Sequence, residues 1–373
     1  MVVAKSGAIP ALSRNCHSQV ASPRVDANRP RCRDAASPGS VPRAATCAGR
    51  RPEVGPLSSI ARRLAALTIA GALLVAGCAN REQSASDQPT KSEGGSQEFP
   101  VTLTPAEGEP VTIDAQPKRI VSLSASNTET LFALGAGKQV VAVDDQSNFP
   151  ADAPKTDLSG LTPNVEAIVG YDPDLVVISD DSDNLVASMK QLDRAVLTVP
   201  AAATLDDMYT GMELLGKATG HADEAADLVE RTKSGLEKVV SDTPKPAKAL
   251  SYYHELDTTL YSATSKTFIG SVYDLFGLTN IADPADQDSG GYPQLSNEHI
   301  LQANPDLIFL ADVRCCGQNA ATVGARPGWS TVNAVKNGDV VELDDDLASR
   351  WGPRVVDLAT AVADAVTKAG EQS

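Results

Sequence analysis

The side chains that most often carry out covalent chemistry are few in this sequence, and their spacing matches no catalytic motif. There are four histidines among 373 residues, and His254-Glu255 lacks the second histidine, four residues on, of a zinc-protease motif. Gly135-Ala136-Gly137 lacks the third glycine of a dinucleotide-binding loop, and the sequence has neither a nucleophile elbow nor a P-loop. The sequence therefore predicts a protein that is not an enzyme and has no catalytic residues, cofactor or metal site.

Polar and aromatic side chains follow several predicted strands, where α/β proteins bind ligands. Ser124, Ser126 and Asn127 open a helix whose first N–H groups suit an anionic ligand, although simple helix capping explains them equally well. In SRWGPR, residues 349–354, two arginines could hold a carboxylate or an anionic chelate while a tryptophan stacks on it. These candidate ligand-binding residues are Ser124, Ser126, Asn127, Tyr253, Tyr261, Arg350, Trp351 and Arg354, with core or rim packing as the alternative for the aromatic ones.

Cys78 has the clearest context among the cysteines. It follows two arginines and an apolar run of about 13 residues, which is too short to span a bilayer and typical of a signal peptide. The run ends in Val-Ala-Gly-Cys at positions 75–78, which resembles the bacterial lipobox, where the cysteine receives a diacylglyceryl group and the preceding peptide is removed. We therefore expect a signal peptide over 54–77, a lipid on Cys78, and an exported protein anchored to the outer face of the cell membrane.

The other cysteines lie at the two ends of the sequence. Cys16, Cys32 and Cys47 precede the expected cleavage point, in an Arg-, Pro- and Ser-rich stretch, 1–53, that predicts a disordered or over-extended N-terminus. Cys315 and Cys316 are adjacent and cannot staple distant segments, so a pair of loop thiols or a strained vicinal disulfide is the simplest interpretation, and a ligand-facing role the alternative. A zinc site would need four ligands and has little support.

The segment after Cys78 is polar and rich in Gly, Ser, Gln and Pro, which predicts a flexible tether over 78–116. After Gly77 the chain holds 45 acidic and 21 basic residues. Such an acidic surface repels phosphate backbones, so nucleic acid is not an expected partner.

From Pro117 on, short apolar strands alternate with helices, which predicts parallel sheets covered on both faces. An N-terminal lobe over 117–220 is expected to hold strands 119–123, 140–143, 175–178 and 196–199 and helices 127–134, 185–192 and 205–219. A short helix is expected to begin at 165–169 and to end before Asp172-Pro173. A long helix over 221–243 would join it to a C-terminal lobe over 247–373. The second lobe is expected to hold strands 249–253, 260–262, 307–310 and 340–343 and helices 268–276 and 355–368.

The two predicted lobes contain a repeated segment. NVEAIVGYDPDLVVI at 164–178 and SNEHILQANPDLIFL at 296–310 share a glutamate, an isoleucine two residues later and Pro-Asp-Leu before an apolar strand. Glu166 and Glu298 occupy the same position in each unit. Two similar lobes joined by one helix indicate a ligand cleft between them, because pockets favour domain interfaces.

The order of these motifs resembles the periplasmic-binding family that serves importers of ferric siderophores, haem and vitamin B12. The resemblance covers about residues 116–370 and rests on RIVSLSASNTETLFALGA (119–136), SNFP (147–150), PDLVVI (173–178), PDLIFL (305–310) and GYPQLS (291–296). It implies two α/β lobes with mainly parallel sheets on one long rigid helix.

The resemblance also implies roles for particular residues. Glu166 and Glu298 would dock the protein on an ABC permease dimer with its ATPase subunits, with a plain first-turn helix acid as the alternative. Asn148, Phe149 and Tyr292 lie where family members have ligand-contacting side chains.

The resemblance implies a binding lipoprotein that captures an iron complex of the ferric siderophore class. Vitamin B12 (cobalamin) or haem is the alternative ligand, and a ligand-sensing surface lipoprotein without transport is the alternative of another class. Members that bind vitamin B12 carry a tryptophan near the position of Gly160-Leu161, which this sequence lacks.

Overall fold

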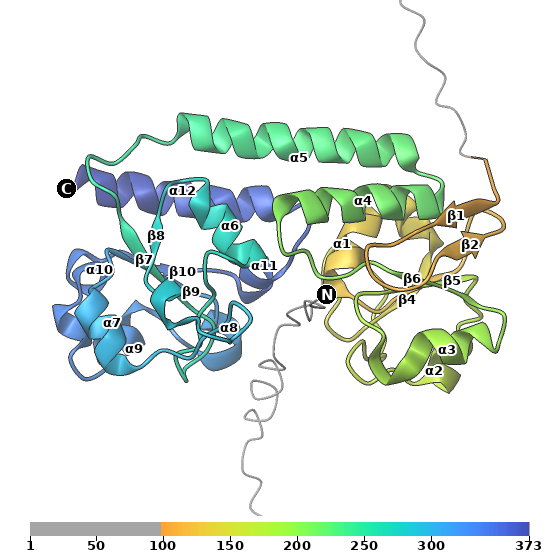
Figure 1. The fold of residues 1–373 in the computed structure, drawn as a ribbon, viewed down its shortest axis with the longest axis horizontal. Helices are drawn as coiled ribbons and strands as arrows, with labels where there is room; N and C mark the ends of the chain where they lie inside the picture. The colour runs from red at the N-terminus through yellow and green to blue at the C-terminus, as the bar shows by residue number, and fades with distance from the viewer. Residues whose placement is uncertain (1–97, 373) are drawn as a thin grey trace, which may run out of the picture. The chain divides into compact units, whose positions relative to one another are not determined.

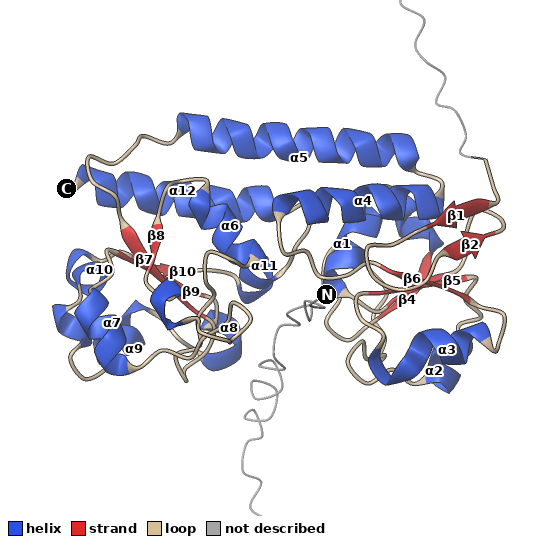
Figure 2. Cartoon of the chain, in the orientation of Figure 1, coloured by secondary structure: helices blue, strands red, loops and turns tan. Residues whose placement is uncertain are grey.

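The computed structural model describes residues 98–372 (Figures 1 and 2). The predictions for the N-terminal extension, the signal peptide, Cys78 and the tether up to residue 97 lie outside these residues. Among the described residues, no helix combines the length and the apolar character needed to cross a bilayer.

Two four-stranded parallel sheets form the centres of two α/β lobes. In chain order, each sheet runs second, first, third and fourth strand from one edge to the other, so the two lobes share one topology. The predicted fold class, two α/β lobes with mainly parallel sheets joined by one long helix, is confirmed. The strands are β4 (Val140–Val143), β3 (Ile120–Ser122), β5 (Leu175–Ile178) and β6 (Ala195–Thr198) in the first sheet, and β8 (Thr279–Asn280), β7 (Ser251–Glu255), β9 (Leu307–Leu310) and β10 (Val340–Glu342) in the second.

Helices lie on both faces of each sheet (Figure 1). Those of the first lobe are α1 (Ala125–Ala133), α2 (Val165–Val169), α3 (Leu185–Lys190) and α4 (Leu205–Thr219), followed by the linking helix α5 (Ala222–Asp242). Those of the second lobe are α6 (Phe268–Asp274), α7 (Asn297–Ala303), α8 (Val313–Cys316), α9 (Ala320–Gly324), α10 (Asn333–Asn337), α11 (Asp345–Ser349) and α12 (Val355–Glu371). Short 3₁₀ turns span Ala136–Gln139, Ser182–Asn184, Asp283–Ala285 and Trp329–Thr331.

The chain passes from the first lobe to the second through α5. Gly220 ends α4 in the left-handed region, at a φ of 79°, which glycine adopts without a Cβ clash. A Cβ on Gly216 would lie 2.4 Å from that of Ala225, so glycine allows α4 and α5 to approach closely. Helix α5 packs on α4 and also on α12 of the second lobe, which ties the two lobes along one side.

The largest apolar core lies on the side of these three helices and includes Leu215 of α4, Leu228 of α5 and Leu358 of α12. A smaller cluster lies on the opposite face of each sheet, around Ile168 in the first lobe and Ile300 in the second. Alternate residues of β5 and β9 join different clusters, because successive strand side chains point to opposite faces. Burial on both faces explains why these strands are apolar throughout.

The repeated segment forms the same turn in both lobes. Asp172 and Asn304 are the residues before the repeated proline, and both adopt left-handed backbone conformations, with φ of 45° and 49°. The carboxylates of Asp174 and Asp306 then accept backbone N–H groups at the start of the neighbouring strand, β3 or β7. The repeated aspartate thus holds two adjacent strands in register.

Two sequence predictions need correction. The tether expected over 78–116 ends earlier, because β1 (Val101–Leu103) and β2 (Val111–Ile113) pair as an antiparallel hairpin. This hairpin buries Leu103 and Ile113, which are 5% and 3% exposed, so it belongs to the folded first lobe. The strand expected over 260–262 contains only an isolated bridge between Tyr261 and Gln294, and it extends neither sheet.

Candidate functional site: a cleft between the lobes

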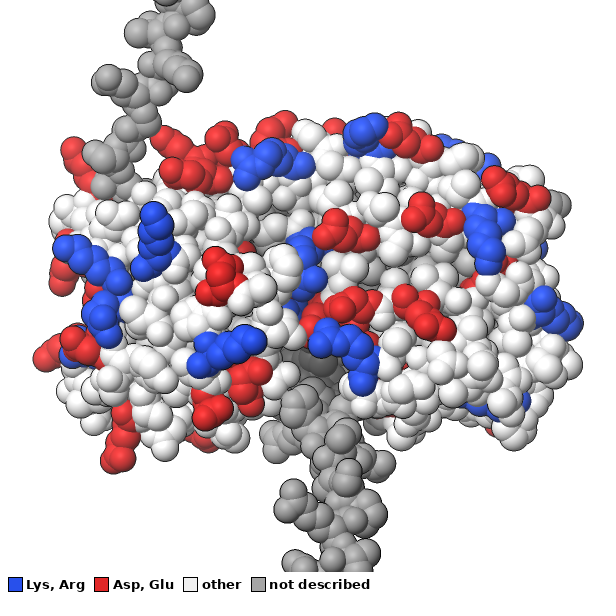
Figure 3. Space-filling model, turned by 180° about the vertical axis from the view of Figure 1, so that it is seen from behind, with Lys and Arg blue, Asp and Glu red and all other residues white. Residues whose placement is uncertain are grey.

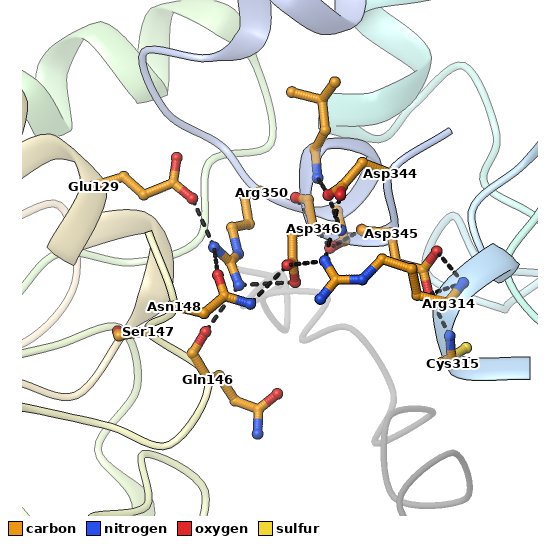
Figure 4. Close-up of polar contacts among 12 residues, drawn as sticks. Glu129, Gln146, Ser147, Asn148, Arg314, Cys315, Asp344, Asp345, Asp346 and Arg350 are labelled. Atoms are coloured by element: carbon orange, nitrogen blue, oxygen red, sulfur yellow. Dashed lines mark hydrogen bonds and ion pairs between the residues drawn. The ribbon is translucent and has the colours of Figure 1, made fainter. Parts of the chain in front are cut away.

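Residues that follow the strands of the two sheets meet between the lobes (Figure 4). The first lobe contributes a glutamate of α1 and two residues of the loop after β4, and the second contributes an aspartate of α11 and two arginines between α11 and α12. We refer to these six residues as the interlobe network: Glu129, Gln146, Asn148, Asp346, Arg350 and Arg354.

Arg350 is the centre of the interlobe network. Its Nη1 donates to Glu129 Oε1 at 2.7 Å and to Asn148 Oδ1 at 2.9 Å. Its Nη2 donates to the Gln146 carbonyl oxygen and to Asp346 Oδ1, both at 2.8 Å. Asn148 Nδ2 in turn donates to Asp346 Oδ2 at 2.7 Å. A planar guanidinium with fixed donors suits this crosslinking between lobes.

Glu129 is a buried carboxylate that pairs with both arginines. Its side chain is 2% exposed and that of Arg350 is 9% exposed, and Arg354 Nε donates to Glu129 Oε2 at 2.8 Å. Removing one partner of a buried ion pair typically costs about 3–5 kcal/mol, because the remaining charge stays desolvated. The contacts of Glu129 therefore hold the two lobes together in this arrangement.

Phe149 and Arg354 form an aromatic contact beside the network. The guanidinium carbon lies 4.3 Å from the ring centroid, within the range of a cation–π interaction. Phe149 is one of the few large apolar side chains that remain exposed in the described part of the chain, so its ring is available to a ligand.

A cavity of about 440 Å³ adjoins the network and is lined by both lobes, which is an ordinary size for a small-molecule site. Ser349 and Trp351, on either side of Arg350, line it. Its other walls are the hairpin residues Ala106 and Glu107, the segment 199–203 with α4 residues Asp207, Thr210, Gly211 and Leu214, and Lys266, Thr267, Phe268, Ile269, Gly290 and Tyr292 of the second lobe.

Two of the aromatic residues chosen from sequence lie in this cavity. Burial raises the pKa of the Tyr292 hydroxyl above its ordinary value of 10.0, which keeps it a neutral hydrogen-bond donor. The indole Nε1 of Trp351 is buried without a hydrogen-bond partner in the structure. Tyr292 can therefore offer its hydroxyl to a ligand, and Trp351 can offer an apolar wall.

Two of the three residues predicted at the start of α1 take part in side-chain hydrogen bonds within the first lobe. Ser124 is the N-cap residue of α1, but its side chain makes no capping hydrogen bond. Asn127 Nδ2 donates to the Val199 carbonyl oxygen at 3.1 Å, and Thr130 bonds to the carbonyl of Ser126. All three predicted residues are buried, and none of them lines the cavity.

The tyrosines chosen after the second-lobe strands also lie away from the cavity. Tyr253 is fully buried and meets Trp329 edge to face, with ring centroids 6.1 Å apart. Tyr261 forms the isolated bridge described above.

Glu166 and Glu298 are exposed and equivalent. Each is the second residue of its helix, α2 or α7, and the residue before that helix caps it through its side chain: Asn164 to Ala167 N and Ser296 to His299 N. Neither glutamate lines the cavity or belongs to the interlobe network.

Several functional candidates escaped the sequence analysis. Glu129 and Asp346 belong to the network, and Arg314 bonds to Asp346 at 2.9 Å and to Asp344 at 3.3 Å. The Asp-Asp-Asp run at 344–346 was the available signal, since such a run before a helix predicts a capping site. Nothing in the sequence pattern marked Glu129, whose partners are 221 and 225 residues away.

Asp144 lies under the loop that carries Gln146 and Asn148. Burial raises the pKa of its carboxyl to about 6, against a hydrogen bond from Ser147 that lowers it. Ser147 also contacts Thr128 of α1 at 2.9 Å, so this buried polar group fixes the loop against the first lobe.

Within residues 98–372, no group of three or more His, Cys, Asp or Glu side chains is arranged to hold a metal ion.

The chain is similar to proteins of a known family. A family model described as "Periplasmic binding protein" matches residues 120–347. The uncharacterized ABC transporter substrate-binding lipoprotein YvrC of Bacillus subtilis (strain 168) is 35% identical over 315 residues, which cover 81% of this chain and 95% of that protein.

Two further comparisons differ in the ligand of the related protein. A cobalamin-binding protein of Halobacterium salinarum is 30% identical over 72% of this chain and 74% of its own length. The crystal structure of a possible iron-binding, periplasmic solute-binding protein of Staphylococcus epidermidis is 27% identical, with a TM-score of 0.60 over 68% of this chain and 99% of that one.

Proposed function

Because the chain belongs to the periplasmic binding protein family and is a substrate-binding protein of an ABC importer, we propose that its cleft captures cobalamin, or a closely related neutral corrinoid, outside the membrane. The protein then delivers this ligand to the permease. Among the ligands considered from sequence, this choice ranks above the ferric siderophore.

The choice of cobalamin over an anionic ferric siderophore rests on the charge of the cleft. Around the interlobe network, the carboxylates of Glu129, Asp144, Asp145, Asp344, Asp345 and Asp346 outnumber the guanidinium groups of Arg314, Arg350 and Arg354. The cavity itself adds Glu107 and Asp207 against Lys266, and Lys266 is already paired with Asp286. An anionic ferric chelate would meet net repulsion here.

A corrinoid suits the same walls. Its periphery carries primary amides, whose N–H groups are donors that match carboxylate acceptors. Its apolar faces can pack on Phe149, Tyr292 and Trp351, and the cavity would hold one side of so large a ligand. The cobalamin-binding relative of Halobacterium salinarum supports this choice.

A ferric siderophore that is neutral or cationic remains the second candidate, supported by the likeness to the iron-binding protein of Staphylococcus epidermidis. Haem is less well matched, because among the described residues no histidine lines the cavity and Tyr292 is the one lining side chain that could bind the haem iron through a phenol oxygen.

Direct titration of the purified protein by calorimetry separates these ligands. Cyanocobalamin, ferrioxamine, ferric citrate and haemin are each added to the same protein sample. We expect saturable one-to-one binding of cyanocobalamin alone. Binding of ferrioxamine without cyanocobalamin would assign the cleft to iron, and binding of none would refute the proposal.

Delivery and anchoring complete the proposed function. The exposed Glu166 and Glu298 would meet basic pockets on the permease, one from each lobe, since charge complementarity sets orientation and association rate. A lipid on Cys78 would keep the protein at the outer face of the membrane.

A further inference from the structure

The two cysteines of the folded part lie side by side in α8. Cys315 is exposed and Cys316 is half-buried, and their Sγ atoms are 2.9 Å apart. This separation brings the two sulfurs into direct contact.

The start of α8 is held by another helix. Asp312 precedes α8 but makes no side-chain cap. Instead, Asp345 of α11 accepts the backbone N–H of Cys315 at 2.7 Å and that of Arg314 at 3.0 Å. The first N–H groups of a helix need such an acceptor, so the backbone that carries the cysteines depends on Asp345.

The same helix, α11, leads to the interlobe network (Figure 4). The side chain of Arg314 bonds to Asp346 Oδ2 at 2.9 Å. Asp346 also accepts a hydrogen bond from Arg350 and, on the same Oδ2, one from Asn148 of the first lobe. Direct contacts therefore run without a break from Cys315 through α11 to the first lobe.

We propose that Cys315 and Cys316 form a redox-modifiable dithiol, and that its oxidation to a vicinal disulfide weakens the interlobe network. The predicted effect on ligand affinity rests on the proposed function, whereas the effect on the network does not. Oxidised protein binds the ligand more weakly, because the network no longer holds the two walls of the cleft in place.

The oxidation is an ordinary thiol–disulfide exchange with a disulfide-bearing oxidant, such as oxidised glutathione or a protein disulfide. One cysteine thiolate attacks the oxidant disulfide and expels a thiolate. The second cysteine thiolate then attacks the sulfur of the first cysteine in this mixed disulfide and expels the remaining thiolate of the oxidant. The cysteine pair loses two electrons and two protons, and the oxidant is reduced to two thiols.

Bonding of adjacent cysteines must disturb α8. Disulfides join residues whose Cα atoms are usually about 4.4–6.8 Å apart, whereas consecutive Cα atoms across a trans peptide are about 3.8 Å apart. This separation is the same in a helix and in an extended chain, so the strain of the disulfide ring falls on the peptide between the two cysteines and on their backbone angles. We expect this strain to break the bonds from Cys316 N to Asp312 O and from Gly317 N to Val313 O. Strained, exposed disulfides are the readily reduced, regulatory ones, so this modification is reversible.

The first test follows the modification and its spread without any ligand. The full chain carrying Ser at Cys16, Cys32, Cys47 and Cys78 is equilibrated with oxidised and reduced glutathione. Peptide mass analysis measures the loss of two hydrogens across Cys315–Cys316, and hydrogen exchange measures backbone protection. We expect about tenfold faster exchange in both α8 and α11 after oxidation, because charge-assisted hydrogen bonds are lost.

The controls define what would overturn the proposal. A further Cys316→Ser replacement should abolish the response to glutathione, and Asp345→Asn in the reduced chain should raise exchange in α8 by itself. No disulfide at any glutathione ratio would refute the dithiol, and a disulfide that leaves exchange in α11 unchanged would refute its coupling to the network.

The second test uses reciprocity, because coupled equilibria influence each other equally. Arg350→Ala breaks the network and should raise the oxidised-to-reduced ratio of the cysteine pair several-fold at a fixed glutathione ratio. Arg194→Ala removes an arginine paired with Asp172, away from the cleft, and should not. Equal ratios in the two variants would contradict the coupling. Absence of cyanocobalamin binding in both redox states would refute the proposed function and leave these ligand-free results intact.

Discussion

Glu129 shows how much the cleft depends on single side chains. Its carboxylate is buried between two guanidinium groups that come from the other lobe. In the low-polarity interior such a charge is stable only when paired and hydrogen-bonded. Glu129 therefore affects both the geometry of the cleft and the stability of the fold, and so do the two arginines that pair with it.

Two substitutions test the proposed ligand contacts. Arg350→Ala and Tyr292→Ala should each weaken cyanocobalamin binding about tenfold or more, through loss of a charge-assisted contact or of an apolar wall. Calorimetric titration measures the dissociation constants, with Arg194→Ala as the matched control. Circular dichroism checks that each variant is folded, and unchanged affinities in both would place the ligand elsewhere.

Asp144 predicts a pH dependence of stability. Its folded pKa of about 6 lies above the ordinary value of 3.8, so the unfolded chain releases the proton at lower pH than the folded protein. The protonated Asp144 carboxyl therefore adds to the free energy of unfolding. This contribution is fully present below pH 3.8, falls as the pH rises toward 6, and is then lost. A shift of this size corresponds to about 3 kcal/mol.

Urea unfolding between pH 4 and pH 7 checks this prediction. The free energy of unfolding of Asp144→Asn should rise relative to that of wild type across this range, because the amide stays neutral in both states. Asp157→Asn, a change at an exposed aspartate, should show no such trend. Parallel curves for Asp144→Asn and wild type would mean that the carboxyl ionises normally.

At the scale of elements, the matched helices α2 and α7 make a distinct prediction about docking. The double reversal Glu166→Lys with Glu298→Lys should abolish uptake, since like charges facing each other at an interface cost several kcal/mol. Ligand affinity and melting temperature should stay close to wild type, because exposed changes usually stay within about 0.5 kcal/mol.

Each single reversal should give intermediate and similar uptake, as the equivalent positions imply. Glu224→Lys is the matched control, because it reverses an exposed acid in the first turn of α5 that has no counterpart in the repeat. Transport of labelled cobalamin into cells measures the effect. Normal uptake by the double variant would mean that both glutamates only stabilise the first turns of their helices and have no role in docking.

The regular elements were predictable because burial patterns repeat along them. The strands at 140–143, 175–178 and 307–310 and the helix at 205–219 were predicted with the bounds that the structure has. The hairpin β1–β2 was missed because each three-residue strand buries a single side chain, which is too short a pattern to read.

The cleft was predictable only in part. The sequence identified Asn148, Phe149, Tyr292, Arg350, Trp351 and Arg354, which lie in the network, beside it or in the cavity. It also favoured Tyr253, whose ring is buried in the second lobe. Whether a strand-end tyrosine faces a cleft or a core depends on which face of the sheet it occupies, and that alternation is not marked where both faces are apolar.

For the molecule as a whole, Cys78 predicts the mode of attachment. Cys78→Ala should release the protein from membranes, because acyl chains hold a lipoprotein firmly while none leaves it soluble. Fractionation of cells followed by immunoblotting measures the membrane-bound fraction. Cys315→Ala serves as the matched cysteine control, and membrane retention of the Cys78 variant would contradict lipid anchoring.

At the scale of the molecule, one face of the folded part carries charges of both signs (Figure 3). On the face seen in Figure 3, basic side chains are interspersed with acidic ones and form no continuous stripe. A protein partner can match such separate charges one by one.

The distance along the chain between Glu129 and its two arginines has a consequence for biosynthesis. Each sheet is built from one uninterrupted stretch of chain, so the first lobe can form while the second is still being synthesised or exported, as domains generally do. Until the segment after α11 arrives, Glu129 has no guanidinium partner and must remain hydrated. Docking of the lobes through Glu129 must therefore follow synthesis of Arg350, and a chain truncated before Arg350 cannot make this contact.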